Sequence, residues 1–92
     1  MKTTRIKFPI GEGLEHRVPS EVMDFLSSSI VEGDLEIDEY EYRSIKISDI
    51  RLDSELVDGK ETYKVYNVDL MGDDKAIKTI ETWFEQFDKP LH

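Results

Sequence analysis

Apolar and polar residues alternate at the start of the chain, which is the pattern of a half-buried β-strand. Three apolar side chains share one parity over residues 4–10, and residues 14–18 repeat the alternation. The connector, residues 11–13, contains two glycines, which tolerate positive φ. The pattern predicts a β-hairpin that joins residues 4–10 to residues 14–18, with His16 packed inward.

Two later segments carry apolar residues at helical spacing. The first, residues 20–32, has Ser20 as a candidate N-cap and Gly33 as a candidate stop. The second, residues 73–88, places its apolar side chains within an arc of about 120° at 100° per residue. The first apolar face consists of Val22, Met23, Phe25, Leu26 and Ile30, and the second of Ala76, Ile77, Ile80, Trp83, Phe84 and Phe87.

Residues 34–71, between the two predicted helices, have the spacing of strands. The parity of their apolar positions switches near Asp38-Glu39 and again near Ser48-Asp49. A switch inside a strand indicates a β-bulge or a break. We therefore expect several strands here, interrupted at those two places, and the pattern leaves open whether residues 34–42 form a strand or an ordered loop.

The Asp58-Gly59 pair between two extended runs is the strongest local signal in the chain. It predicts a tight type I′ hairpin that joins residues 44–57 to residues 60–71. The arms are long, so the hairpin is expected to twist or to extend past the core. This turn sets a register with two facing pairs, Leu52 with Val65 and Ser54 with Tyr63.

The predicted order of elements is ββαβββα within a single domain, residues 1–92. Antiparallel hairpins with helices on one face make an α+β fold. We expect an antiparallel sheet of four to five strands with two helices packed on one face. A chain of 92 residues buries one modest core and leaves no room for a deep active-site cavity.

The composition narrows the class of protein. The chain has no cysteine, which excludes disulfides, thiolate zinc sites and cysteine nucleophiles. A small secreted domain would usually need such cross-links, so we expect a cytoplasmic protein. Lys2 and Arg5 are not followed by the apolar stretch of a signal peptide. The apolar runs are too short to cross a membrane.

The net charge of −9 is unevenly distributed. Residues 1–18 carry +4 and −2, and residues 43–92 carry +8 and −11. Between Arg17 and Arg43 there is no lysine or arginine, but there are eight acids: Glu21, Asp24, Glu32, Asp34, Glu36, Asp38, Glu39 and Glu41. Such a surface repels nucleic acid phosphates and anionic lipid, so we expect neither direct nucleic acid binding nor a membrane partner. Only a small basic patch is predicted, on the outer face of the first hairpin: Arg5, Lys7 and Arg17.

An acid-rich stretch is often only a solvated face. If residues 34–42 are extended, however, the acids after Leu35 form an outward comb, with same-face side chains every ~6.7 Å. One DNA strand presents a charge every ~3.4 Å of axis, so mimicry of DNA would need a second row of acids beside the comb. The candidates for that row are Glu21 and Asp24, or Asp49 and Asp53.

Four tyrosines lie in the predicted strand region beside the acids. Tyrosine is enriched at binding hot spots, although strand propensity alone also explains its presence. We predict that the acids set the association rate with a partner and that Tyr40 and Tyr42 anchor it. The predicted partner-binding residues are Glu36, Asp38, Glu39, Tyr40, Glu41, Tyr42, Glu21 and Asp24.

Signals for an enzyme are weak. The serines at 27–29 have no nucleophile motif, and the many acids make any carboxylate pair unspecific. The run from Asp34 begins like a calcium loop but has Glu39 where glycine is required. We therefore expect no catalytic residues, no metal site and no cofactor.

The sequence favours a small acidic, non-enzymatic module that binds a basic protein. A nuclease or another nucleic-acid-handling protein would be such a partner, and the chain would then act as an inhibitor, antitoxin or immunity-like blocker. The alternative is a structural subunit of a homo- or hetero-oligomer that self-associates through the long hairpin, with the acids serving solubility.

Overall fold

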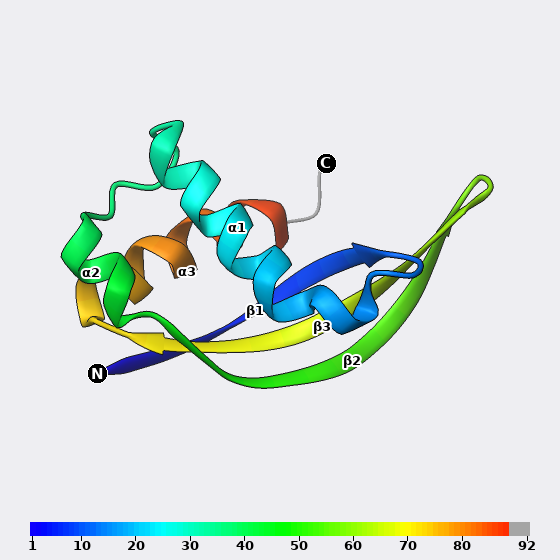
Figure 1. The fold of residues 1–92 in the computed structure, drawn as a ribbon, viewed down its shortest axis with the longest axis horizontal. Coiled ribbons are helices and arrows are strands. Elements are labelled where there is room, and N and C mark those ends of the chain that lie inside the picture. The colour runs from blue at the N-terminus through cyan, green and yellow to red at the C-terminus, as the bar shows by residue number, and fades with distance from the viewer. Residues whose placement is uncertain (89–92) are drawn as a thin grey trace.

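The computed structural model describes residues 1–88, which form one antiparallel sheet with helices on one of its faces (Figure 1). The strands are β1 (Lys2–Gly11), β2 (Lys46–Asp58) and β3 (Glu61–Gly72). The helical elements are the 3₁₀ turn η1 (Glu15–Arg17) and the helices α1 (Val18–Val31), α2 (Glu39–Ser44) and α3 (Asp74–Asp88). The α+β class is confirmed. In place of the predicted four to five strands and two helices, the described chain has three strands and three α-helices.

The strand order is β1-β3-β2, so the last strand in sequence is the central one. β1 pairs with β3 along its whole length, from Lys2 opposite Gly72 to Gly11 opposite Tyr63. β3 suits the central place because its apolar side chains are almost completely buried, namely Val65, Val68 and Leu70. Consequently β1 and β2 are both edge strands.

The prediction that residues 14–18 form a strand paired with β1 is wrong. After a turn, the chain enters η1 and passes directly into α1. Val18 is 1% exposed because it begins the buried stripe of α1. Pro19 fits there, since a helix tolerates proline in its first turn. His16 is exposed in η1 rather than packed inward.

α1 matches the helix predicted over residues 20–32 but begins two residues earlier. Arg17 rather than Ser20 occupies the N-cap position, and the Ser20 hydroxyl donates to the Arg17 carbonyl at 3.2 Å. The predicted stop is confirmed, since Gly33 follows the helix with φ +88°. The fully buried stripe of α1 consists of Val18, Val22, Leu26 and Ser29.

β2 and β3 form the hairpin that Asp58-Gly59 predicts, but the turn differs from the prediction. Asp58 lies opposite Glu61, so the two loop residues are Gly59 and Lys60. Gly59 has φ +64°, and no non-glycine residue of the described chain has a positive φ. A type I′ turn is therefore excluded, and the pattern is that of type II′.

The register of this hairpin shifts twice, which leaves Ser48 and Asp53 as the extra residues of β-bulges. The first bulge confirms the parity switch predicted near Ser48-Asp49. Because of the second bulge and the displaced turn, both predicted facing pairs are replaced: Leu52 lies opposite Tyr66, and Ser54 opposite Val65.

The core lies between the sheet and the helical layer. α3 confirms its predicted apolar face, with Ala76, Ile77 and Ile80 fully buried, while the side chain of Phe87 falls outside the described part. The β2–β3 hairpin runs past the helices, as predicted, and residues 51–61 are all exposed (Figure 1). Among residues 1–88, no helix is long and apolar enough to cross a membrane.

Candidate functional site

The acid-rich segment begins where α1 ends. The Gly33 N–H donates to the Ile30 carbonyl at 3.1 Å, and the Asp34 N–H donates to the Ser29 carbonyl at 2.9 Å. These two bonds form a Schellman motif, which requires the left-handed conformation that glycine adopts without strain. The motif reverses the chain and sends the acids back along the helical layer.

Residues 34–37 belong to no helix or strand, and their burial alternates as predicted. Leu35 and Ile37 are buried in the core, whereas Asp34 and Glu36 are exposed. The first half of the predicted comb is therefore present. It is anchored by the two apolar side chains rather than by pairing with another strand.

The comb ends at Asp38, where a helix follows instead of either alternative for residues 34–42, a strand or an ordered loop. The Asp38 carboxylate accepts from the Glu41 N–H at 2.7 Å, and the Glu41 carboxyl accepts from the Asp38 N–H at 3.5 Å. This reciprocal pair is a capping box, and it starts α2. The interruption predicted near Asp38-Glu39 is therefore a helix start rather than a bulge.

Because residues 39–44 are helical, the side chains of Glu41 and Tyr40 point to the opposite sides from those predicted. Glu41, expected outward, is 9% exposed, and Tyr40, expected inward, is 84% exposed. Tyr42 is half-buried, and its hydroxyl donates to the Met23 carbonyl at 3.4 Å. Of the two predicted anchors, only Tyr40 presents most of its ring to solvent.

Asp38 and Glu41 form an electrostatically coupled pair. The backbone N–H of Glu41 and the nearby Glu41 carboxyl hold the pKa of Asp38 below its usual value. The Asp38 carboxyl, followed by desolvation, raises the pKa of Glu41. Asp38 thus ionises more readily than Glu41, and Glu41 retains a proton more readily than an exposed glutamate.

A cleft of about 780 Å³ lies between this acidic segment and α3. Asp34, Glu36, Asp38 and Glu41 line one side of it. The other side comes from a polar stripe of α3 and the ring beside it: Lys75, Lys78, Thr79, Thr82, Trp83 and Gln86. Sequence reasoning missed this stripe, although the i, i+4, i+7, i+11 spacing of residues 75, 79, 82 and 86 marks one face of a helix.

The other predicted acids lie elsewhere. Glu39 pairs with Arg43 at 2.5 Å on the surface of α2. Glu21 and Asp24 are on α1 and do not line the cleft. Glu21 precedes the end of α1 by ten residues, which is about 15 Å along the axis. Within residues 1–88, no salt bridge involves Glu21, Asp24, Glu32, Asp34 or Glu36.

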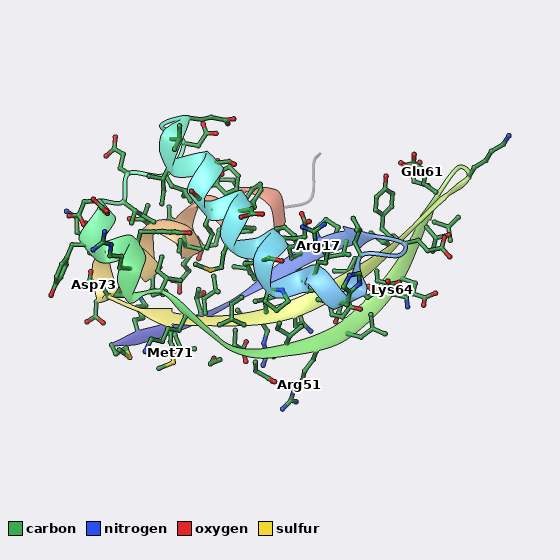
Figure 2. The ribbon with its side chains drawn as sticks, in the orientation of Figure 1. Arg17, Arg51, Glu61, Lys64, Met71 and Asp73 are labelled. Carbon is green, nitrogen blue, oxygen red and sulfur yellow. The ribbon has the colours of Figure 1, made fainter. Side chains whose placement is uncertain are left out.

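β2 does not supply a second row of acids beside the comb. Asp49 accepts from Arg51 at 2.7 Å, and Figure 2 shows Arg51 extending from the side of the sheet opposite the helices. Asp53 lies 3.8 Å from Lys7. This strand therefore gives no support to the idea that two rows of acids mimic the charge spacing of DNA.

The open face of the sheet is neutralised internally. Arg5 donates to Asp69 at 2.7 Å, and this bond holds the pKa of Asp69 below its usual value. With Lys7 near Asp53, two of the three cations of the predicted basic patch contact acids of the same chain. Arg17 belongs to η1 instead of the sheet. Within residues 1–88, the acids without a salt-bridge partner thus lie mainly in the helical layer, and the others are Glu12, Glu55, Asp58 and Glu61 in the turn after β1 and the β2–β3 hairpin.

Comparison with protein-family models, with curated proteins and with solved structures gives no match for this chain.

Proposed function

We propose that this protein is a non-enzymatic module that binds a basic protein through the acidic end of its helical layer. The partner class that suits it is a nuclease or another nucleic-acid-handling protein. The chain would act as an inhibitor, antitoxin or immunity-like blocker.

One observation carries this proposal: Tyr40 is 84% exposed on α2, and the segment that leads into α2 has three exposed acids, Glu32, Asp34 and Glu36, without a salt-bridge partner within residues 1–88. Exposed tyrosine surrounded by charge is typical of a hot spot with a polar rim. Glu32, Asp34 and Glu36 would steer a basic partner toward it, because like charges without internal partners extend their field into solvent. The acids on the open face of the sheet contribute less, since they are paired.

The variants that test this proposal have to leave the capping box of Asp38 and Glu41 intact. Reversing Asp38 or Glu41 would unfold α2 and confuse binding with folding. The informative variant therefore combines Glu32→Lys, Asp34→Lys and Glu36→Lys, all at exposed positions. A matched control makes the same change in net charge at three other exposed acids, Glu12, Asp58 and Glu85.

The experiment starts from a tagged chain used as bait with a salt series in the wash. Any retained basic protein is purified, and its association rate is measured with each variant. We expect the Glu32, Asp34 and Glu36 reversal to slow association about tenfold or more at low salt, and Tyr40→Ala to speed dissociation. Equal association rates for the reversal and its control would contradict the proposal, as would the absence of any basic partner at every salt concentration.

The second candidate is self-assembly through the β2 edge. It is favoured by the exposed apolar side chains of the hairpin, since Leu52 and Leu56 are each 54% exposed and Val57 is 74% exposed. The same strand carries two bulges and several charges, which are features that discourage edge-to-edge pairing. We therefore place it second, and sedimentation of the purified chain at increasing concentration tests it.

A further inference from the structure

One of the carboxyl groups that line the cleft beside α3 has an oxygen without a hydrogen-bond partner. Glu41 is 9% exposed, and its Oε1 accepts from the Asp38 N–H at 3.5 Å. Its Oε2 is buried and has no partner among the described residues. A buried oxygen without a partner is costly, and such groups in folded proteins are usually satisfied by something.

We propose that this cleft binds the guanidinium group of an arginine side chain, with the Asp38 and Glu41 carboxyls as its acceptors. The arginine would belong to the basic partner, so this inference rests on the proposed function and specifies how the partner is held. A guanidinium is planar and has five N–H donors, and it can therefore serve two adjacent carboxyls at once. The bonds would be charge-assisted, and one of them would satisfy the buried oxygen.

The cations of α3 do not make this an anion site. Lys75 and Lys78 also line the cleft, but both are exposed at the ends of flexible stems. Lys78 lies 4.0 Å from Glu81, which offsets part of its charge. The buried polar group is a carboxyl, so the ligand has to supply donors. The pKa of Glu41 is raised overall by the Asp38 carboxyl, but the positive charge of Lys75 favours the ionised form of both carboxyls, which makes Lys75 the resident competitor of an incoming cation.

Trp83 provides the fluorescence signal with which binding to the cleft is measured. It is the only tryptophan of the chain and lines the same cleft, so its fluorescence reports on an occupant. The probe is Nα-acetyl-arginine amide, which carries a guanidinium and no other charge. Its matched control is Nα-acetyl-citrulline amide, in which a neutral ureido group replaces the guanidinium. Nα-acetyl-lysine amide distinguishes a guanidinium site from a site for any cation. Amide NMR shifts of residues 38–41 locate the binding.

Three variants of the protein complete the experiment. Glu41→Gln keeps an acceptor for the Asp38 N–H but places an amide donor at the position of the orphan oxygen. Glu85→Gln removes the same charge from an exposed position outside the cleft and outside the proposed binding surface. Lys75→Gln removes the competing cation. Thermal melts establish that each variant is folded.

We expect saturable binding of the arginine probe with a dissociation constant on the order of millimolar. The citrulline probe should bind about tenfold more weakly, and the lysine probe several-fold more weakly. Glu41→Gln should lose about tenfold in affinity, and Glu85→Gln should change it less than about twofold. Lys75→Gln should tighten binding about twofold.

Several results would overturn the inference. They are equal binding of the arginine and citrulline probes, equal binding of the arginine and lysine probes, and unchanged affinity in Glu41→Gln. An equal loss in Glu85→Gln would reduce the effect to overall charge, and weaker binding in Lys75→Gln would contradict the role of Lys75 as a competing cation. If the probe fails while a basic partner is still captured and responds to the Glu32, Asp34 and Glu36 reversal, only the cleft inference falls. If the probe binds as expected while no basic partner is found, the proposed function falls instead.

Discussion

The Asp38 carboxylate lies 2.7 Å from the Glu41 backbone nitrogen, and this bond converts an extended acidic segment into a helix. The same turn places the Glu41 side chain against α3 and exposes the ring of Tyr40. A single local contact thus decides that the Glu41 carboxyl is buried beside the cleft while Tyr40 faces solvent.

Loss of this cap should destabilise α2. Asp38→Ala removes the acceptor of the Glu41 N–H, and we expect the melting temperature to fall by about 5 °C at neutral pH. Asp34→Ala is the matched control, because Asp34 is exposed and its carboxylate makes no hydrogen bond within residues 1–88. Differential scanning calorimetry of both variants measures the effect. Equal melting temperatures would contradict the structural role of the capping box.

The titration of Asp38 and of Glu41 makes the folding stability depend on pH, and the two groups act in opposite directions. The pKa of Glu41 is raised above its ordinary 4.5, so the folded chain binds this proton more tightly than the unfolded chain. Its contribution is present below pH 4.5 and is lost as the pH rises through the raised pKa. The pKa of Asp38 is lowered from 3.8, so its contribution is present above pH 3.8 and is lost as the pH falls through the lowered value.

Glu41→Gln isolates the Glu41 part of this dependence. The amide resembles protonated glutamate and keeps the capping box. We expect wild type and variant to melt at similar temperatures near pH 4, and the variant to melt a few degrees higher at pH 7. Urea denaturation at half-unit pH steps checks the result. A constant difference between the two proteins across the whole range would rule out titration of Glu41 as the cause.

The predictable part of the fold is the part that local patterns encode. The apolar face of α1 from Val22 onward and the apolar face of α3 follow from helical spacing. Gly33 ends α1 and Gly59 turns the hairpin because both positions require positive φ. The bulge at Ser48 is visible as a parity switch in the sequence.

The errors occur where two local interpretations compete or where a distant partner decides. The three-residue spacing between the apolar residues Ile37 and Tyr40 fits a bulged strand and a helix start equally well. The Asp-x-x-Glu pattern at Asp38 is the sequence signal that distinguishes them, because it forms a capping box. β1 could pair with the next segment or with β3, and only the burial of β3 between two strands favours the latter. The cleft depends on how α3 packs against residues 33–38, which no local pattern contains.

Gly72 should be sensitive to any side chain because α2 ends against it. A Cβ at this position would lie 3.1 Å from the Ile45 Cα and 3.2 Å from the Ser44 carbonyl oxygen. These are backbone atoms, so the last turn of α2 would have to move. We expect Gly72→Ala to cost about 1–3 kcal/mol of unfolding free energy.

The control for Gly72→Ala is Gly11→Ala, at the end of β1. Neither glycine has a positive φ, and a Cβ at Gly11 would meet nothing within 4 Å. Urea denaturation should therefore show a large loss for one variant and almost none for the other. Similar losses would mean that the glycine contributes through backbone flexibility rather than close packing.

The charges of β2 should keep its open edge from pairing with other copies. Arg51, Asp53 and Glu55 lie in an exposed stretch that ends in Leu56 and Val57, and Asp53 is also a bulge residue. Replacing all three charged residues by threonine leaves an uncharged segment of high β-propensity, which is the pattern of an aggregation-prone edge. We expect this variant to form dimers or larger species at concentrations where the wild type sediments as a monomer.

The control removes the same charges from the helical layer through Lys78→Gln, Glu32→Gln and Glu85→Gln, and it should remain monomeric. A wild-type dimer at micromolar concentration would instead favour assembly through this edge, because charges and bulges would then have failed to block it.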